Sequence, residues 1–421
     1  MRVLVVGSGG REHALAWRLS LSASVSELFA APGNAGTAAI ARNLPIAATD
    51  LPGIVRAASE HRIDLVVVGP EVPLSLGLVD QLQQAGIAAF GPCRNAARLE
   101  SSKAFAHDIM RSCGIPAAEA RVFTSFPEAR EFVAALKPPV VVKADGLAAG
   151  KGAVVAQTTR EAESALEDML VRRIFGEAGD RVIIEEYLEG REVSLLAFTD
   201  GTHVVPMVPA CDYKRVKDND VGPNTGGMGS YSPPAFFGAD MVKRTVDEVI
   251  TPVVRAMAAN GWEYRGVLYA GLMVQGDRMR VLEFNARFGD PETQAILPRL
   301  EGDLGDILMA CAGGTLDTVT IGWKTGPSVA VVLASGGYPG TYAKGLPISG
   351  LGQVDRNVSV FHAGTTTSAD GRIVTDGGRV LAVVATADTM AEARERVYNN
   401  VIRISFPHMM FRTDIALREV A

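Results

Sequence analysis

The chain has 421 residues, of which 48% are hydrophobic and 21% are charged, and its formal net charge is -6. A chain of this length is too long for one hydrophobic core and predicts roughly two to four domains. The composition is that of a soluble globular protein. The acidic balance argues against a nucleic acid as the main partner, because phosphate backbones favour a basic surface, but it leaves room for local basic pockets.

The cysteine spacing and the lengths of the apolar runs indicate where in the cell the protein is expected. Cys93, Cys113, Cys211 and Cys311 lie far apart and form no paired metal motif, which favours free thiols in a reducing compartment. Residues 1–7 have the pattern of a first strand and not of a secretory signal. No apolar run reaches the roughly 20 residues of a membrane span. We therefore expect a cytoplasmic protein that does not contact membranes.

Residues 1–100 alternate short apolar strands with helices. The pattern predicts strands at 3–6, 28–31, 65–68 and 88–90, and helices at 12–21 and 76–85. Apolar strands separated by helices predict a doubly wound parallel sheet, which binds ligands at the carboxyl ends of its strands. The loops 7–11, 32–36 and 69–73 follow such ends and are candidate ligand loops.

From residue 101 the spacing of the elements changes. Closely spaced strands, with helices at 103–112, from 160 and at 240–260, predict an α+β region with antiparallel pairing. Residues 209–234 are rich in Gly, Asp, Asn and Pro and predict a long irregular segment, either functional or disordered. After residue 326, strands at 328–334 and 380–385 and a helix from 390 predict a separate mixed α/β lobe. We expect domains at 1–100, 101–325 and 326–421.

The first candidate site is the glycine-rich turn at 7–13 (GSGGREH). Glycines between a strand and a helix let the backbone approach a phosphate. A dinucleotide fingerprint would need a third glycine where Glu12 stands and an acidic residue after the second strand, so an NAD site is disfavoured. Arg11 favours a phosphate monoester. A tight turn without a ligand is the alternative.

The second candidate is residues 140–152 (VVVKADGLAAGKG). Only three residues separate Gly146 from Gly150, and Gly152 replaces the hydroxyl residue of a P-loop. Apolar runs on both sides predict a hairpin whose glycine-rich tip folds over triphosphate oxygens, with Lys151 at the tip and Lys143 on the strand. The alternative is a flexible hairpin with solvated lysines.

The third candidate is residues 280–292 (RVLEFNARFGDPE). Strand alternation places Glu283, Asn285 and Arg287 on one face, with Leu282 and Phe284 on the other. A carboxylate and an amide oxygen at this spacing suit Mg²⁺, and Arg287 would neutralise a transferring phosphoryl group. The alternative is a solvated strand face.

Two weaker patterns complete the candidates. Residues 183–192 pass from apolar to acidic and suit an adenine and ribose pocket, although a charged strand edge fits equally. The segment 212–230 suits a mobile loop that binds a polar substrate, or else a disordered excursion. The chain has no G-x-S-x-G, H-E-x-x-H or C-x-x-C motif, so nothing predicts a covalent nucleophile.

Together these motifs resemble those of a known family. The strings GSGGREHAL (7–15), KADGLAAGKG (143–152), GPNTGGMGSYSP (222–233) and FNARFGDPETQ (284–294) are similar to those of the glycinamide ribonucleotide synthetases, or phosphoribosylamine–glycine ligases, of the ATP-grasp superfamily. The resemblance extends from end to end. It implies a central ATP-grasp fold at 101–325, with a mobile small lobe at about 122–188, between the N-terminal parallel sheet and the C-terminal lobe.

The resemblance implies a carbon–nitrogen ligase. ATP, glycine and 5-phosphoribosylamine would give ADP, phosphate and glycinamide ribonucleotide through glycyl phosphate, in the second step of de novo purine biosynthesis. Mg²⁺ or Mn²⁺ would assist, catalysis would rest on positioning and electrostatics, and a monomer is expected.

The resemblance also implies roles for individual residues. ATP and its phosphates would contact Lys103, Lys143, Gly150, Lys151 and Gly152, and adenine and ribose would contact Glu185, Glu186, Leu188 and Glu192. Phosphoribosylamine would contact Gly9, Gly10, Arg11, Asn34 and Glu71. The metal would bind Glu283 and Asn285, and the catalytic candidates are Asp212, Lys214, Arg287 and Asp290.

Three alternatives remain at this level. Another ATP-grasp ligase with a different carboxylate would share the lysines and the metal strand, but the N-terminal loops and residues 222–233 favour the glycine enzyme. A non-catalytic nucleotide sensor would have no need of Glu283, Asn285 and Arg287. A dehydrogenase would need the missing third glycine.

Overall fold

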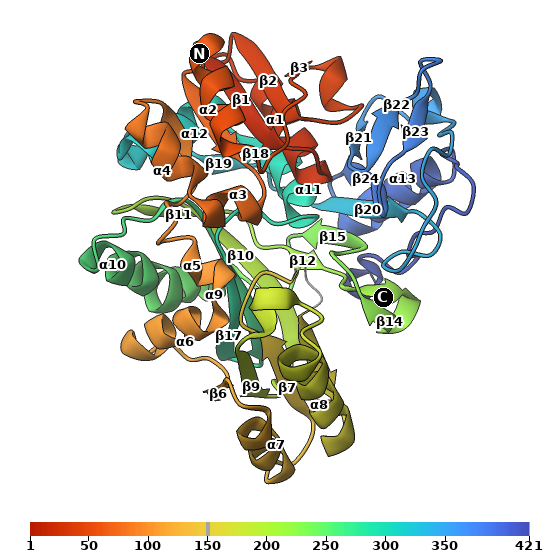
Figure 1. The fold of residues 1–421 in the computed structure, drawn as a ribbon. Helices are drawn as coiled ribbons and strands as arrows, with labels where there is room; N and C mark the ends of the chain where they lie inside the picture. Colours follow the sequence, from red (N-terminus) through yellow and green to blue (C-terminus); the bar gives the residue numbers. More distant parts are fainter. Residues whose placement is uncertain (149–151, 421) are drawn as a thin grey trace.

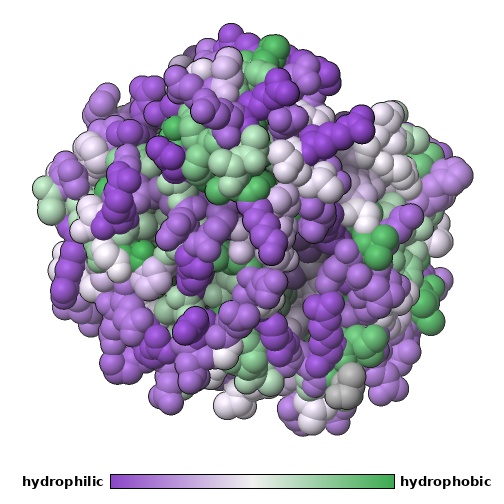
Figure 2. All heavy atoms as spheres, turned by 90° about the horizontal axis from the view of Figure 1, so that it is seen from below, coloured by the Kyte–Doolittle hydropathy of each residue, from purple (hydrophilic) through white to green (hydrophobic). Residues whose placement is uncertain are grey.

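Four larger β-sheets organise the computed structural model, which describes residues 1–148 and 152–420. The N-terminal sheet lies at the top of Figure 1, a small lobe at the bottom and the C-terminal sheet at the right, with the central sheet between them. No helix of the described chain is long and apolar enough to cross a membrane. The face seen from below is mainly hydrophilic, and its apolar areas are scattered (Figure 2).

The N-terminal sheet is parallel, in the order β3-β2-β1-β4-β5, which confirms the predicted doubly wound sheet. The order reverses between β1 and β4, so the loops after these strands border the crevice where such sheets bind ligands. The strands are β1 (Arg2–Gly7), β2 (Glu27–Pro32), β3 (Arg42–Asn43), β4 (Leu65–Val68) and β5 (Ala88–Phe90). The helices are α1 (Gly10–Ser20), α2 (Leu51–Glu60), α3 (Glu71–Leu76) and α4 (Leu78–Gln84).

Two details differ from the prediction. The helix predicted at 76–85 is divided at Gly77, whose φ of 90° places it in the left-handed region that glycine tolerates. Helix α2 was not predicted, although Asp50 caps it by accepting a hydrogen bond from the Gly53 N–H at 3.0 Å.

The small lobe, residues 120–186, has its own antiparallel sheet in the order β6-β9-β7-β8. Its strands are β6 (Ala120–Phe123), β7 (Val140–Ala144), β8 (Ala153–Ala156) and β9 (Val182–Glu186), and its helices are α7 (Phe126–Ala134) and α8 (Thr159–Leu166). Strands β7 and β8 pair with Val142 opposite Val154, which confirms the predicted hairpin. Buried Val133, Val142, Leu166 and Ile184 give the lobe a separate core.

The central sheet is antiparallel, in the order β11-β10-β16-β17. Its strands are β10 (Arg191–Asp200), β11 (Val204–Pro206), β16 (Arg265–Gln275) and β17 (Arg278–Asn285). The associated helices are α5 (Arg98–Ser101), α6 (Lys103–Ser112), α9 (Ala239–Thr245), α10 (Thr251–Ala259), α11 (Glu292–Ile296) and α12 (Leu304–Gly313). A π-helical turn, Val246–Ile250, joins α9 to α10, so the helix predicted at 240–260 is nearly continuous.

The C-terminal sheet includes strands from far upstream. Its order is β12-β15-β20-β24-β21, with β12 (Cys211–Asp212), β15 (Gly229–Ser232), β20 (Ser328–Ala334), β21 (Val358–His362) and β24 (Arg379–Thr386). Helix α13 (Met390–Val401) covers it, and β22 (Thr365–Thr367) pairs with β23 (Ile373–Thr375). The prediction that 209–234 is irregular was wrong, because the segment holds β12, β13 (Arg215–Lys217), β14 (Val221–Asn224) and β15. Ser230 pairs with Ala330, a partner that local pattern does not reveal.

The predicted domain boundary at residue 326 falls between β19 (Gly322–Trp323) and β20. We propose 1–100, 101–325 and 326–421 as the three domains, with the small lobe at about 122–188. The pairing of β15 with β20 then makes the second and third domains share one sheet.

The C-terminal tail fixes the β13–β14 hairpin through a buried arginine. The side chain of Arg412 is fully buried and donates to the Asp414 carboxylate at 2.7 and 2.6 Å, to Asp220 Oδ1 at 2.9 Å and to the Arg215 carbonyl at 3.1 Å. Arg418 also pairs with Asp220, at 2.7 Å, but its side chain is 64% exposed.

We expect Arg412→Met to lower the free energy of unfolding by about 3 kcal/mol, because Asp414 and Asp220 would lose their buried cation. Arg418→Met should cost less than about 1 kcal/mol, because solvent screens that pair. Urea denaturation of the two variants measures both values. If both variants lowered the free energy of unfolding equally, buried Arg412 would not be the residue that fixes the hairpin.

Candidate active site

A cavity of about 920 Å³ lies between the small lobe, the central sheet, the loops of the N-terminal sheet and the segment 211–226. Most of the predicted site residues line it: Arg11, Glu71, Lys103, Lys143, Gly152, Glu185, Glu186, Leu188, Glu192, Asp212, Lys214, Glu283, Asn285, Arg287 and Asp290. Gly150 and Lys151 lie outside the described residues. The tertiary structure therefore brings together residues that are up to about 280 positions apart in the chain.

At the small-lobe side of the cavity, Lys143 and Glu185 form a buried pair between β7 and β9. Lys143 Nζ lies 2.7 Å from Glu185 Oε2, and His107 Nε2 lies 2.9 Å from Glu185 Oε1. Burial opposes ionisation of Glu185, but the charge of Lys143 and the hydrogen bonds outweigh it and lower the pKa of the carboxyl. Lys103 Nζ donates to the Gly146 carbonyl at 3.2 Å, and burial lowers the pKa of this lysine. A bound phosphate would favour the charged form of Lys103.

The other predicted nucleotide residues differ in their surroundings. Leu188 is 7% exposed and lines the cavity. The Glu186 carboxylate instead pairs with Arg280 and accepts the Glu119 N–H at 2.8 Å. The carboxylate of Glu192 forms an ion pair with Lys214.

The predicted metal strand lies along the cavity. Glu283 is half-buried and makes no hydrogen bond or ion pair with any described residue, although a carboxylate taken out of water normally has a partner. Burial opposes its ionisation, but the charges of Lys214, Lys143 and Lys103 lower the pKa of Glu283. Asn285 Oδ1 accepts a hydrogen bond from Arg287 at 3.2 Å. An ionised carboxylate and an amide oxygen two residues apart fit a hard divalent cation.

The predicted alternation fails at Leu282, which was placed on the opposite face. Gly271 pairs with Glu283 and Leu272 pairs with Val281, so Leu282 is the extra residue of a bulge. Leu282 and Phe284, both predicted for the opposite face, are among the residues that line the cavity with Glu283 and Asn285. The bulge accounts for the departure at Leu282.

Arg287 is held by two carboxylates from the N-terminal part of the chain. It lies 2.8 Å from Glu100 and 3.5 Å from Glu71. Burial would lower the pKa of Arg287, but the charges of Glu100 and Glu71 raise it. Glu100 also accepts the Ala286 N–H at 2.7 Å. No sequence motif surrounds Glu100, so it was not among the predicted site residues.

Asp212 and Lys214 lie beside the metal strand. Burial raises the pKa of Asp212 well above its usual value, and nearby Glu292, Glu192 and Glu283 act in the same direction, against Lys214. Burial would lower the pKa of Lys214, but Glu192 and Asp212 raise it. This end of the cavity therefore gathers more carboxylates than the single lysine can neutralise.

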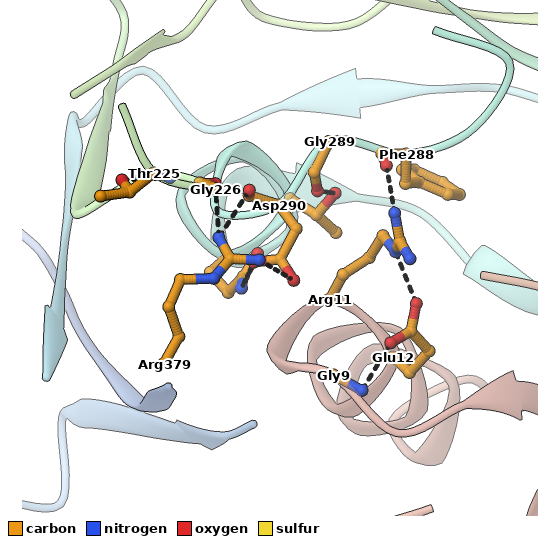
Figure 3. Close-up of polar contacts among 12 residues, drawn as sticks. Gly9, Arg11, Glu12, Thr225, Gly226, Phe288, Gly289, Asp290 and Arg379 are labelled. Atoms are coloured by element: carbon orange, nitrogen blue, oxygen red, sulfur yellow. Dashed lines mark hydrogen bonds and ion pairs between the residues drawn. The ribbon is translucent and has the colours of Figure 1, made fainter. Parts of the chain in front are cut away.

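The turn at 7–13 is organised by Glu12, the residue that excluded a dinucleotide fingerprint. Its carboxylate accepts the Gly9 N–H at 2.6 Å and Arg11 Nε at 2.5 Å, and Arg11 also donates to the Phe288 carbonyl at 3.1 Å (Figure 3). A side chain at Gly69 would meet Glu12 at 2.2 Å. Glu12 thus fills the space between the loops after β1 and β4, and Gly10 begins α1 beside it.

A second cavity, of about 590 Å³, adjoins the first. Gly9 and Asn34 line it from the N-terminal side and Thr365–Thr367 from the C-terminal side, and Asp290 and Arg379 line both cavities. Arg379 donates to the carbonyls of Gly226 at 2.6 Å and Asp290 at 2.8 Å (Figure 3). Burial opposes ionisation of Asp290, but Arg379 and Arg11 lower its pKa. Sequence reasoning missed Arg379, which no motif marks.

Asn34 shapes the wall of this second cavity. Its amide donates to the carbonyls of Ser8 at 2.9 Å and His362 at 2.8 Å, and its oxygen accepts the N–H groups of Gly36 at 2.8 Å and Thr37 at 3.0 Å. The side chain is occupied by the protein itself, so we propose that Asn34 serves the substrate by fixing the loop.

Two histidines join the same loop to the C-terminal sheet. His13 Nδ1 accepts the backbone N–H of His362 at 2.7 Å, and its ring packs edge-on against Phe361. Burial lowers the pKa of His13 to about 3, and burial lowers that of His362 to about 4. Because His13 Nδ1 accepts this hydrogen bond, the contact requires a neutral His13 imidazole.

Comparison with protein families gives three matches that together cover most of the chain. Residues 1–100 match the model for the phosphoribosylglycinamide synthetase N domain, 101–293 the ATP-grasp (A) domain, and 328–418 the C domain.

Among individual proteins, the chain is 49% identical to the phosphoribosylamine–glycine ligase of Vibrio cholerae, with 100% of this chain and 99% of that protein covered. It is 48% identical to the enzyme of the same name from Xanthomonas campestris, with 100% and 98% covered.

Among solved structures, the chain is similar to the phosphoribosylamine–glycine ligase of Thermotoga maritima, with a TM-score of 0.86, 33% identity, and 98% and 100% of the two chains covered. A biotin carboxylase domain of Hydrogenobacter thermophilus, solved with MgADP, has a TM-score of 0.73 at 16% identity, over 97% and 91% of the chains. This last similarity shows the fold alone.

The two histidines predict a loss of stability in mild acid. Their folded-state pKa values lie below the ordinary 6.5, so the unfolded chain binds protons first as the pH falls. Their contribution to the free energy of unfolding is complete above about pH 6.5 and declines as the pH falls, down to about pH 4 for His362 and about pH 3 for His13. We expect His362→Gln to make the pH dependence of the unfolding free energy shallower in this window, by up to about 1.4 kcal/mol per pH unit. Urea denaturation at a series of pH values measures this slope, and parallel curves for both proteins would refute the assignment.

Proposed function

Because this chain belongs to the phosphoribosylglycinamide synthetase family, we propose that it joins glycine to 5-phosphoribosylamine with ATP, as its relatives' name, phosphoribosylamine–glycine ligase, indicates. The products would be glycinamide ribonucleotide, ADP and phosphate, in the second step of de novo purine biosynthesis. The chain is an ATP-grasp ligase. It would use ATP with a divalent metal ion, and the MgADP in the structurally similar biotin carboxylase domain supports this proposal. Full-length similarity at 49% identity supports the specific reaction.

The observation that carries the mechanism is the gathering of Lys103, Lys143, Glu283 and Arg287 in one cavity. The two lysines are placed to bind phosphate oxygens as point charges. Arg287, held by Glu100 and Glu71, keeps a positive charge in place for the transferring phosphoryl group. Because these charges are fixed before substrate arrives, little reorganisation is needed during the reaction.

We assign the metal ion, as Mg²⁺ or Mn²⁺, to Glu283 and Asn285. The fit rests on the ionised Glu283 carboxylate, which lacks a partner among the described residues, and on the adjacent amide oxygen of Asn285. The ion would screen the negative charge that the phosphates and the glycine carboxylate bring together. Asp212, Lys214 and Asp290 would then surround the reacting groups.

The reaction would pass through glycyl phosphate. An oxygen of the glycine carboxylate attacks the γ-phosphorus, and the bond to the ADP oxygen breaks. The amine of phosphoribosylamine then attacks the glycyl carbonyl carbon, and phosphate leaves with the former carboxylate oxygen. We propose that phosphoribosylamine enters along Gly9, Gly10, Arg11, Asn34 and Glu71, where Gly9 and Asn34 line the second cavity and Arg11 and Glu71 the first.

We also propose a cytoplasmic monomer. All four cysteines are free, in keeping with a reducing compartment. A single chain supplies both cavities with their lining, so catalysis would need no second copy.

The direct test is ADP release from ATP and Mg²⁺ with freshly made phosphoribosylamine and a panel of small carboxylates. We expect turnover only when both glycine and phosphoribosylamine are present. Turnover with a different carboxylate would indicate a sister ATP-grasp ligase. Binding of ATP without turnover would favour a nucleotide sensor.

We expect Glu283→Gln to reduce metal-dependent turnover at least about 100-fold, because the amide removes the charge that binds the cation. The thermal melt should stay close to that of the wild type, since the carboxylate has no described partner to lose. Glu301→Gln, at an exposed position, serves as the matched control with unchanged turnover. Full activity in Glu283→Gln with a native melt would overturn the metal assignment.

A further inference from the structure

A buried carboxylate without a cation partner lies in the central cavity. Glu292, the first residue of α11, is 3% exposed and lines the cavity. Its Oε1 accepts hydrogen bonds from the hydroxyls of Tyr269 at 2.6 Å and Ser194 at 3.2 Å. These hydroxyls, on strands β16 and β10, lie 2.7 Å from each other. Two buried hydroxyls thus hold the carboxylate in one place.

The partners of Glu292 are all neutral. Among the described residues Glu292 forms no ion pair, whereas Glu185 pairs with Lys143 and Glu100 pairs with Arg287. The charge of Glu292 contributes to raising the pKa of Arg287, but that arginine is committed to Glu100 and Glu71. An ionised carboxylate buried among neutral donors is costly. This arrangement points to a cation that arrives with a ligand.

A second carboxylate faces the same space. Asp212, on β12, lines the cavity and makes no side-chain hydrogen bond or ion pair with a described residue. Burial raises its pKa, and the charge of Glu292 adds to the effect, so the two carboxylates are close enough to repel. A cation placed between them would remove this repulsion.

The two carboxylates lie next to the metal strand. A side chain at Gly271 would sit 3.3 Å from Glu283 Cγ and 3.7 Å from the Tyr269 ring, so the tyrosine that holds Glu292 neighbours Glu283. A small ligand with a cation at Glu292 can therefore direct its other end toward Glu283 and Asn285. That arrangement suits a molecule with opposite charges a few atoms apart.

We propose that Glu292, together with Asp212, binds the ammonium group of glycine and so selects an α-amino acid as the carboxylate substrate. This inference rests on the proposed function. Glycine carries an ammonium group with three N–H donors beside its carboxylate, and charge-assisted hydrogen bonds to two carboxylates match it. The ammonium takes no part in bond making, so Glu292 acts in binding and specificity. Molecules of the same size without the cation, such as glycolate, would leave both carboxylates unpaired.

The test compares glycine with glycolate as acyl donors, through ADP release by the full-length chain with ATP, Mg²⁺ and phosphoribosylamine. Glu292→Gln keeps the size of the side chain and an oxygen for Tyr269 and Ser194, but removes the charge. We expect kcat/KM for glycine to fall about 100-fold, mainly through KM, with KM for ATP nearly unchanged. The preference for glycine over glycolate should fall by a similar factor. Glu301→Gln, exposed on the surface, should leave the preference as it is.

Two outcomes would overturn the assignment. If Glu292→Gln lowered kcat/KM equally for glycine and for glycolate, Glu292 would have a structural role. If the variant needed a higher Mg²⁺ concentration, and not a higher glycine concentration, Glu292 would be a metal ligand. If Glu292→Gln does not fold, Tyr269→Phe is used for the same comparison, because it removes one hydrogen bond to the Glu292 carboxylate. That variant should lower the glycine preference about 5-fold, and an unchanged preference would contradict the inference.

The same experiment separates this inference from the proposed function. Absence of glycine-dependent turnover in the wild type would refute the proposed function. Turnover with glycine in the wild type, and an intact glycine preference in Glu292→Gln, would refute only the role of Glu292.

Discussion

The structure depends on the pairing of charges that are buried in the central cavity. An ionised side chain removed from water is costly unless an opposite charge or several hydrogen bonds compensate it. Lys143 with Glu185 ties β7 to β9 in the small lobe, and Arg287 with Glu100 ties the segment that follows β17 to α5. Arg379 with Asp290 ties the C-terminal sheet to the start of α11. The pairs that make the cavity polar are thus the contacts that hold its walls together.

The charges that stay without a protein partner then mark where ligands bind. Among the described residues, Glu283 and Asp212 have no hydrogen-bonding or ionic partner, and Glu292 has only hydroxyls. These three carboxylates lie at one end of the cavity, near Lys214, which is already paired with Glu192. A metal ion and a substrate ammonium together would supply the missing positive charge. The same physical rule therefore explains both the walls and the proposed subsites.

The C-terminal sheet has a structural role in the site as well as its own core. Strands β12 and β15 bring Asp212, Thr225 and Gly226 to the cavity. These strands pair into a sheet built mainly from residues after 327. Arg379 reaches from β24 to the Gly226 carbonyl, and His362 holds the loop of Asn34. Both cavities thus form only when the three parts of the chain pack together.

The sequence by itself determined the elements and motifs whose cause is local. Apolar periodicity predicted the parallel sheet and the β7–β8 hairpin, and the spacing of Lys143, Glu283, Asn285 and Arg287 predicted side chains that do line one cavity. Only the tertiary structure decided the contacts between distant residues. Ser194 donates a hydrogen bond to Glu292, which lies 98 positions away in the chain. Ala286 donates one to Glu100, 186 positions away, and Ser230 pairs with Ala330. The Leu282 bulge likewise depends on the register with β16. Such contacts follow from how sheets pack and pair, and no local pattern of residue types encodes them.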